Sequence, residues 1–162
     1  MELILPELSL VLLIGPSGSG KSTFARRHFR PTEIISSDAC RALVCDDESN
    51  QAASREAFEL LHHIVRQRLL WRRFTVVDAT NLQADARKPL IELARRYHYL
   101  TCAIVFDLTE EVCQTQNLLR PDRVVPGSVV TTHAQAMTRI GAALDKEFFT
   151  RRYHFQKREE VD

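Results

Sequence analysis

The sequence has little of what membrane, metal-binding or disulfide-bonded proteins require. Its 162 residues contain no apolar run near the roughly 20 residues of a membrane-spanning helix, and the N-terminus lacks the basic leader and small-residue cleavage site of a signal peptide. The four cysteines form no CxxC pair and no zinc spacing. We therefore expect a cytoplasmic protein without a membrane partner, whose thiols are reduced and mostly buried.

Net charge is also small, because 22 Lys and Arg residues face 21 Asp and Glu residues and give +1. Nucleic-acid-binding proteins are commonly basic, so the total charge argues against that class. The distribution is less even: residues 21–30 carry four Lys or Arg and no acid, and residues 66–73 carry four arginines and no acid. Such runs are either solvated helix faces or places that attract phosphate.

No repeat, low-complexity segment or flexible linker divides the chain, and its length predicts one domain over residues 1–162. The apolar pattern alternates between strands and helices. The expected strands are residues 8–14, 33–36, 74–77 and 100–108, and the expected helices are residues 21–29, 54–71, 85–97 and 109–119. We also expect one last helix after Pro126, an edge strand within residues 148–155 and a frayed tail from Lys157. This alternation predicts an α/β fold with a central parallel sheet covered by helices on both faces.

A phosphate-binding motif follows the first expected strand. The letters GPSGSGKST match G-x-x-x-x-G-K-[ST] at every required position and stand between a strand and a helix. The glycines let backbone amides and the helix N-terminus face a phosphate, Lys21 reaches the β- and γ-phosphates, and the Ser22 hydroxyl can ligate Mg²⁺. The residues expected to contact the nucleotide are Gly15, Ser17, Gly18, Ser19, Gly20, Lys21, Ser22 and Thr23.

A P-loop alone does not separate kinases from GTPases or motor ATPases, so the end of the second strand is informative. It reads SSDACR, which places Asp38 and Arg41 at the edge of the sheet where ligands bind. If a helix begins there, both residues lie on one face of it. The carboxylate can accept the proton of an attacking hydroxyl, and the arginine can steer that carboxylate or bind an acceptor phosphate. Alternatively, Asp38 caps the helix and forms a surface ion pair with Arg41, which leaves no obvious base.

The third strand also ends in polar residues. Asp78 stands where a Walker B carboxylate would, although it could equally cap a turn. Thr80 and Asn81 are either turn residues or contacts to an acceptor. Elsewhere, four conspicuous side chains are expected to pack on helices or lie on the surface rather than bind ligands: His62, His63, Trp71 and His133.

A basic segment follows the fourth strand and its helix. Residues 116–128 contain Arg120 and Arg123 on either side of Pro121, which ends the helix. We expect a helical lid that closes over bound phosphates, so that a guanidinium meets the charge that develops during transfer. The alternative is a solvated helix end.

These segments together resemble the kinase domain of the bacterial polynucleotide kinase-phosphatases, which are multifunctional RNA repair enzymes. The similar stretches are LSLVLLIGPSGSGKSTFARRHF, EIISSDACRALVCDDE, FTVVDATN with ARKPLIELARRYH, and the lid segment, and they cover most of residues 8–123. The resemblance implies a P-loop kinase fold and transfer of the γ-phosphate of an NTP to the 5′-OH end of RNA or DNA, with Mg²⁺. Because no guanine-specific N-K-x-D motif is present, we expect ATP and other NTPs to serve as donors.

The resemblance also implies a role for each site residue: Lys21 and Ser22 serve the donor, Asp38 is the general base, Arg41 serves the acceptor, and Arg120 and Arg123 belong to the lid. In that family the kinase is the N-terminal module and is followed by phosphatase and ligase modules, so we expect such partners in the same polypeptide. One departure is Gln116, where the family's lid helix carries a further arginine. Two other functions stay open, namely a P-loop kinase of a small metabolite or sugar nucleotide, and a nucleotide-binding switch or adaptor without transfer chemistry.

Overall fold

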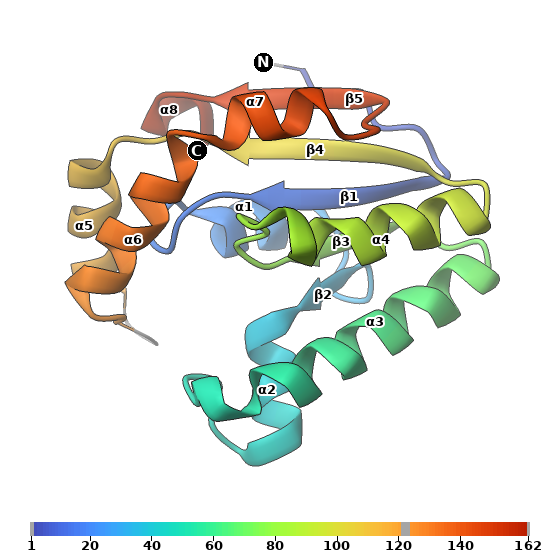
Figure 1. Cartoon of the computed structure of the whole chain (residues 1–162), viewed down its shortest axis with the longest axis horizontal. Helices are drawn as coiled ribbons and strands as arrows, with labels where there is room; N and C mark the ends of the chain where they lie inside the picture. The colour runs from blue at the N-terminus through green and yellow to red at the C-terminus, as the bar shows by residue number, and fades with distance from the viewer. Residues whose placement is uncertain (1, 121–123, 162) are drawn as a thin grey trace.

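The computed structural model describes residues 2–120 and 124–161, which form one sheet with helices on both sides (Figure 1). In chain order the elements are β1 (Ser9–Ile14), α1 (Lys21–His28), β2 (Ile34–Ser36), α2 (Ser37–Cys45), a 3-10 turn (Gln51–Ala53), α3 (Ser54–Leu70), β3 (Thr75–Asp78), α4 (Ala84–Arg96), β4 (Leu100–Phe106), α5 (Glu110–Leu118), α6 (Gly127–Met137), α7 (Ile140–Asp145), β5 (Arg151–Phe155) and α8 (Arg158–Val161). Apart from the last helix, the expected strands and helices are present within a few residues of their predicted bounds.

The sheet has the order β2-β3-β1-β4-β5, and every neighbouring pair is parallel. The first strand of the chain is therefore the central one. Its register pairs Leu13 with Asp78 of β3 and with Ile104 of β4. All strands thus end at one edge of the sheet, where a parallel α/β fold presents its ligand-binding crevice.

Successive residues of β1 face opposite sides of the sheet, and both sides are buried. Leu10, Leu12 and Ile14 belong to one apolar cluster, whereas Val11 and Leu13 belong to the other. This explains why the strand is a continuous apolar run and not an alternating one. The predicted sheet with helices on both faces is confirmed.

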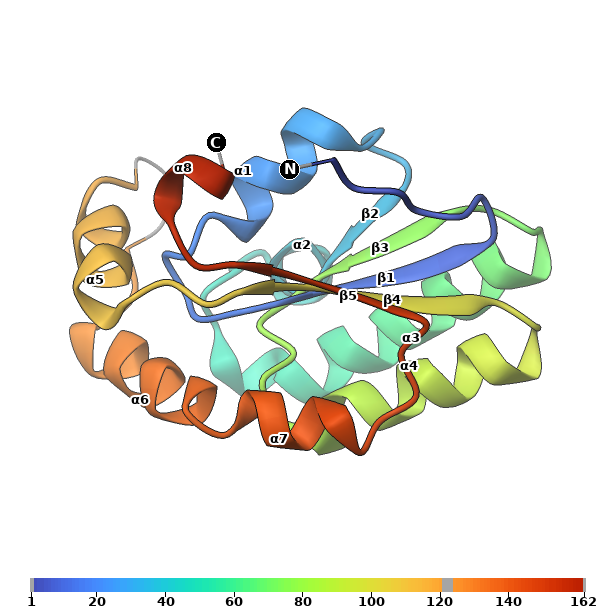
Figure 2. The same ribbon diagram turned by 90° about the horizontal axis from the view of Figure 1, so that it is seen from above.

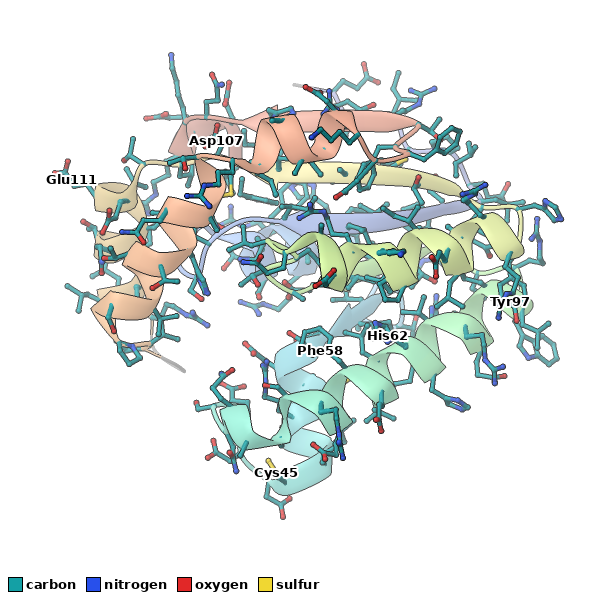
Figure 3. All side chains as sticks on the ribbon, in the orientation of Figure 1. Cys45, Phe58, His62, Tyr97, Asp107 and Glu111 are labelled. Atoms are coloured by element: carbon teal, nitrogen blue, oxygen red, sulfur yellow. The ribbon has the colours of Figure 1, made fainter. Side chains whose placement is uncertain are left out.

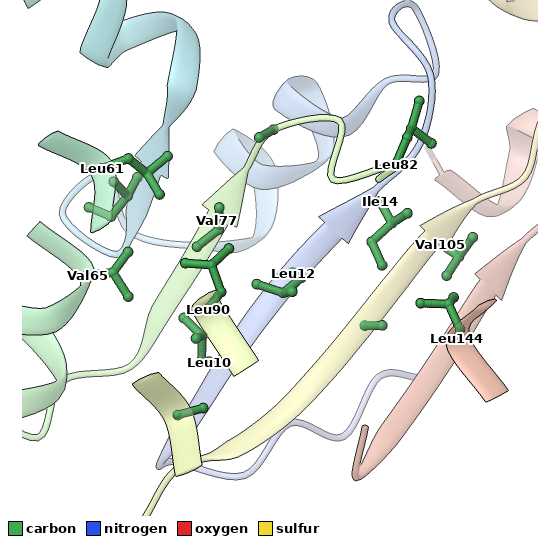
Figure 4. Packing of buried hydrophobic residues seen from close by; sticks show 14 of the residues in the cluster. Leu10, Leu12, Ile14, Leu61, Val65, Val77, Leu82, Leu90, Val105 and Leu144 are labelled. Atoms are coloured by element: carbon green, nitrogen blue, oxygen red, sulfur yellow. The ribbon is translucent and has the colours of Figure 1, made fainter. Parts of the chain in front are cut away.

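The helices divide between the two faces (Figure 2). The lower face in that view is covered by α3, α4 and α7, whose Leu61, Leu90 and Leu144 pack against β1, β3 and β4 (Figure 4). The upper face carries α1 and α8. There the ring of Phe24 lies 5.4 Å from those of both Phe106 and Phe155, edge to face.

A buried ion pair connects the lower helices to the ligand edge of the sheet. The guanidinium of Arg87 is fully buried and donates to both carboxylate oxygens of Glu147 at 2.6 to 3.0 Å. It also donates to the carbonyl of Asn81 at 2.8 Å, and the Asn81 amide in turn donates to the carbonyl of Leu13 at 2.8 Å. This chain of contacts holds the end of β3 beside the end of β1.

Two expectations for the C-terminal part were wrong. The single last helix is two helices, because the backbone amides of Thr138 and Arg139 bond to carbonyls three residues back, at 3.3 and 3.2 Å, and the regular α-helical pattern stops there. The tail is not frayed: it forms α8, where Glu160 accepts hydrogen bonds from two preceding backbone amides and Val161 is buried in the cluster around Phe24. The predicted edge strand is confirmed as β5.

The described part of the chain contains no helix with the length and apolar character needed to cross a bilayer.

Candidate active site

The P-loop connects β1 to α1 at the ligand edge of the sheet. Gly18 and Gly20 adopt φ values of 83° and 91°, a region that only glycine enters without strain. Gly18 also lies so close to α5 that a Cβ there would be 2.4 Å from the carbonyl of Cys113. The loop begins with the amide of Gly15 bonded to the carbonyl of Thr80 at 3.0 Å. Its shape is therefore fixed by β3 on one side and α5 on the other.

Lys21 is buried within this loop. Its ammonium donates to the carbonyl of Pro16 at 2.8 Å and lies 3.4 Å from the hydroxyl of Ser19. Burial lowers the pKa of Lys21 to about 8, although the nearby carboxylate of Asp78 opposes this change. A phosphate that entered the loop would relieve the cost of this buried charge.

Ser22 and Asp78 meet beside Lys21. The Ser22 hydroxyl donates to a carboxylate oxygen of Asp78 at 2.7 Å. Burial raises the pKa of Asp78, while Lys21 and this hydrogen bond favour its charged form. Asp78 ends β3 and is therefore held by the sheet rather than serving as a turn cap.

The oxygen donors at this point fit a magnesium ion. Mg²⁺ binds to hydroxyl and carboxylate oxygens and usually keeps several waters or substrate phosphates as further ligands. Ser22 and Asp78 supply one group of each kind. Within residues 2–120 and 124–161 no group of three or more His, Cys, Asp or Glu is arranged to hold a metal ion. The assignment of Ser22 to the metal stays a prediction.

Asp38 and Arg41 stand on the first turns of α2, directly after β2. Arg41 donates to Asp38 at 2.7 Å and to the hydroxyl of Ser54 at 3.2 Å. The helix is capped by Ser36, whose hydroxyl accepts from the amide of Ala39, so Asp38 is not the cap. The Arg41 side chain is only 8% exposed and Asp38 is 33% exposed, which shows that the pair is not a simple surface ion pair. Its partially exposed carboxylate remains accessible to a ligand.

Asn81, which follows β3, makes a contact that stabilises the fold. Asn81 has a φ of 50° and is turned inward, where its amide bonds to the carbonyl of Leu13. Its side-chain oxygen is the one buried side-chain N or O atom without a hydrogen-bond partner among the described residues. Asn81 was interpreted either as a turn residue or as a contact to an acceptor. This geometry agrees with a turn residue that ties the end of β3 to β1.

The expected lid begins with α5, which packs on the P-loop. Gln116 donates to the carbonyl of Gly18 at 2.8 Å, so the glutamine bonds to the protein's own loop. Arg120 is half-buried, and its charge adds to the burial that lowers the pKa of Lys21, so the two cations are near each other. Arg123 lies outside the described residues. Asn117 both donates to and accepts from the backbone of Val125, at 2.7 and 3.0 Å, and closes the base of the segment between α5 and α6.

Two contacts to the P-loop were missed from the sequence. His133 was expected to be a packing or surface residue, but its Nδ1 accepts a hydrogen bond of 3.0 Å from the amide of Ser17. The Gln116 contact to Gly18 was likewise not foreseen. Both join residues about a hundred positions apart, and neither has a local sequence signal.

A separate cavity lies near the start of α5. It has a volume of about 590 Å³ and lies between the end of β4, the start of α5 and the junction of α6 and α7. Its walls include Asp107, Glu110, Met137 and His154, and Asp107 is labelled at this end of the molecule in Figure 3. No P-loop residue lines it, so it is distinct from the site described above.

Comparison with known proteins places this arrangement among P-loop proteins. The profile of AAA_33, an AAA domain family, matches residues 10–140. A chain in the structure of the Pnkp1/Rnl/Hen1 RNA repair complex is 23% identical, with a TM-score of 0.72, over 87% of this chain and 47% of that chain. No curated protein matches the sequence significantly.

Two smaller kinases have similar structures. A gluconokinase from Sinorhizobium meliloti 1021 is 19% identical with a TM-score of 0.58, over 96% of this chain and 87% of that chain. A sugar kinase from Janibacter sp. HTCC2649 is 16% identical with a TM-score of 0.62, over 96% of this chain and 90% of that chain. The chain thus spans about half of the chain in the RNA repair complex and most of each sugar kinase. At these identities the likeness establishes the fold.

Proposed function

The chain belongs to the AAA domain family AAA_33 and has the fold of P-loop kinases, and on this basis we propose that it is a polynucleotide 5′-hydroxyl kinase. Such an enzyme transfers the γ-phosphoryl group of ATP or another NTP to the 5′-OH end of RNA or DNA. The acceptor oxygen forms a bond to phosphorus, the bond from phosphorus to the β–γ bridging oxygen breaks, and the hydroxyl proton passes to a base.

The Asp38–Arg41 pair carries this proposal. A carboxylate that is one-third exposed stands beside the P-loop, and its partner arginine is held by Ser54 and by Asp38 itself. Asp38 is placed to accept the proton of the attacking hydroxyl. Arg41 keeps the carboxylate oriented, and its remaining donors can bind the phosphate that follows the attacked nucleoside. A polynucleotide end has such a phosphate, whereas a simple sugar does not.

The donor side is formed by the P-loop and Lys21. The backbone amides of residues 18–22 and the N-terminus of α1 would hold the β- and γ-phosphates. Lys21 is already beside this loop and would exchange its bond to Pro16 for a phosphate oxygen. Ser22 and Asp78 would hold Mg²⁺, which supplies charge that offsets the negative phosphates. Arg120 would add a guanidinium where charge develops in the transition state.

The resemblance to the kinase domain of the bacterial polynucleotide kinase-phosphatases supports this assignment. The similar stretches include the P-loop, the Asp38–Arg41 helix and the strand that ends at Asp78. The likeness to a chain in an RNA repair complex agrees with it. We therefore also propose that phosphatase and ligase modules accompany this kinase in a longer polypeptide.

A second candidate is a kinase of a small metabolite or sugar nucleotide. The observation in its favour is that the chain matches most of a gluconokinase and of a sugar kinase in length and fold. Both candidates use the same P-loop, base and lid, so only the acceptor separates them. A nucleotide switch without transfer chemistry would not need Asp38.

The test is a transfer assay with γ-labelled ATP and Mg²⁺. The acceptors are a 5′-OH oligoribonucleotide, a 5′-OH oligodeoxynucleotide and a panel of sugars, nucleosides and other small hydroxyl compounds. We expect label at the 5′ end of an oligonucleotide. Labelled metabolite with unlabelled oligonucleotide would refute the proposal in favour of the second candidate, and no label on any acceptor would favour the switch.

A further inference from the structure

A basic surface lies at the end of the molecule opposite the P-loop. The last turns of α3 and α4 end side by side there, next to the loops that lead into β3 and β4 (Figure 1). We call it the arginine–tryptophan surface, and it consists of Arg66, Trp71, Arg72, Arg73, Arg95 and Arg96, all of which are exposed. Residues 62–73 and 93–100 contain no acid, and Glu92 is the nearest acid in sequence on α4.

Contacts between the two loops make this a single surface. Arg72 donates to the carbonyl of Tyr97, and its guanidinium lies over the ring of Tyr99, 5.0 Å from the centroid. The Tyr99 hydroxyl donates to the carbonyl of Arg73 at 2.9 Å. Figure 3 labels Tyr97 at this end, where several long side chains project outward. The arginines of α3 and α4 are therefore held near one another by the fold.

The surface is built of side chains available to a ligand. Trp71 is 73% exposed, and Leu70 and Leu100 are 57% and 40% exposed. Arg66, Arg95 and Arg96 form no side-chain hydrogen bond or ion pair with any residue of the described ranges. Arginines at helix C-termini interact favourably with the negative ends of the helix dipoles, and this explains why positive charge gathers at these two helix ends. It does not explain why an exposed tryptophan lies among the arginines.

A groove opens next to these arginines between α3 and α4. It has a volume of about 240 Å³ and is lined by His62, Pro89, Glu92, Leu93 and Arg96. Figure 3 shows His62 on the side of α3 that faces α4. Arg96 belongs both to the groove and to the surface, so the groove adjoins the positive charge, and its other walls are two apolar side chains, one histidine and the acid Glu92.

From these observations we infer that the arginine–tryptophan surface binds single-stranded nucleic acid. Guanidinium groups bind successive phosphates, and an exposed indole ring stacks on a base of any sequence. A single phosphate would engage one or two arginines, whereas five arginines spread over two helix ends suit a polyanion.

The surface can hold part of the acceptor in the proposed kinase reaction, and this part of the inference rests on the proposed function. Helix α3 begins at Ser54, which holds Arg41 of the acceptor pair, and its 17 residues end beside Trp71. The helix is about 25 Å long. Nucleic acid whose 5′ end is at Asp38 would reach the surface by running along α3, past Arg55 and the exposed acids Glu56 and Glu59, and the surface would hold its distal part.

Direct binding is tested with the fluorescence of Trp71, which is the one tryptophan of the chain. The probe is a 5′-phosphorylated single-stranded oligonucleotide of about 16 nucleotides, which cannot accept a second phosphate at that end. We expect quenching, and we expect the double variant Arg95→Ala/Arg96→Ala to weaken binding about tenfold or more. The slope of log K against log salt should become less negative by about 1.4, for two lost phosphate contacts on a single strand.

Controls keep this test decisive. The double variant Arg139→Ala/Lys146→Ala removes two exposed charges from another face and should bind like the wild type. Trp71→Ala, followed by anisotropy of a labelled oligonucleotide, should also weaken binding. The inference is overturned if the oligonucleotide does not quench Trp71, if both double variants lose equal affinity, or if polyglutamate of equal charge quenches as strongly.

Transfer kinetics test the connection with the acceptor. With 5′-OH acceptors of about 16 nucleotides, Arg95→Ala/Arg96→Ala should raise KM about tenfold and leave kcat unchanged, whereas acceptors of about 4 nucleotides should show no difference. An equal rise in KM for both lengths would contradict the extended path. If no oligonucleotide is phosphorylated, the proposed function fails, and the fluorescence titration still decides whether the surface binds nucleic acid.

Discussion

The hydroxyl of Ser22 donates a hydrogen bond of 2.7 Å to the carboxylate of Asp78, and this bond joins the P-loop to the end of β3. The two residues are 56 positions apart in the chain. Parallel pairing of β1 with β3 brings them together, since Leu13 stands opposite Asp78 in the register. The hydroxyl and the carboxylate thus form a unit that the sheet assembles before any ligand arrives.

Replacing Asp78 with Asn tests this unit as a magnesium site. The amide keeps the size but loses the charge, so the Mg²⁺ concentration for half-maximal transfer should rise about tenfold or more. Nucleotide binding in the presence of a chelator should be unchanged or tighter, because a negative charge beside the phosphates is removed. Transfer rate as a function of Mg²⁺ and calorimetric nucleotide titration measure the two effects. An unchanged Mg²⁺ requirement would exclude Asp78 from the site.

Lys21 should make nucleotide affinity depend on pH. Burial lowers its pKa to about 8, against an ordinary value of 10.5. Bound phosphates favour the charged form and raise the pKa again, so binding above pH 8 takes up a proton. Affinity should then fall as the pH rises through about 8, by up to tenfold per pH unit.

Calorimetry in buffers of different ionisation enthalpy measures this proton uptake. In Lys21→Arg the guanidinium stays charged, so the pH dependence and the proton uptake should both disappear. Burial also raises the pKa of the neighbouring Cys113 thiol, to about 11, so that thiol stays neutral over the range tested. Wild-type affinity that is constant from about pH 7 to about pH 10 would show that Lys21 is not at the phosphates.

Asp38→Asn should lower kcat by at least about 10²-fold, because it removes the proposed base. Nucleotide affinity should change little, since the P-loop backbone and Lys21 hold the phosphates. The matched control is Asp85→Asn, which changes an exposed aspartate in the first turn of α4 and should have no effect. More than about a tenth of wild-type turnover in Asp38→Asn would mean that another group takes the proton.

Gln116 and Arg120 should differ in the kinetic constant they affect. Gln116→Ala removes one hydrogen bond to the P-loop and should weaken nucleotide binding about fivefold, equivalent to about 1 kcal/mol. Arg120→Ala should lower kcat by about 10²-fold or more, because in the proposed mechanism its charge acts on the transition state. Steady-state kinetics with varied ATP separate the effects. A larger loss of kcat in Gln116→Ala than in Arg120→Ala would refute these roles of the lid.

The buried pair of Arg87 and Glu147 should be costly to break. Glu147→Ala leaves a fully buried guanidinium without its carboxylate and should lower the free energy of unfolding by about 3–5 kcal/mol. The double variant Arg87→Met/Glu147→Met removes both charges and should recover part of that loss. Denaturant unfolding measures all three proteins. A double variant that is no more stable than Glu147→Ala would contradict this account of the pair.

Much of the fold could be predicted from the sequence because its signals are local. The P-loop glycines, the continuous apolar run of β1 and the helical periods of α3 and α4 each reflect nearby residues. The ion pair between Asp38 and Arg41 follows from their spacing of three on a helix. That Ser36 rather than Asp38 caps this helix was not foreseen, since serine and aspartate are both good caps.

The remaining features depend on contacts between distant segments. The bond from Ser17 to His133 spans 116 positions, and a histidine on a helix is ordinarily a packing or surface residue. A frayed tail was predicted from Lys157 onward because most of its residues are charged. Only the fold shows that Val161 reaches the cluster around Phe24 and stabilises α8 there. Local pattern carries no information on such pairings.

The central place of β1 has a consequence for biosynthesis. The strand leaves the ribosome before both of its partners, β3 and β4, and β4 ends at Phe106. One edge of this run of six buried residues therefore stays unpaired while about 90 more residues are made, and such exposed apolar segments are prone to aggregate. Sheet formation also requires long-range pairing, which is slow compared with helix formation. Fragments that end before β4 should therefore accumulate in insoluble form, whereas chains that include it can pair both edges of β1.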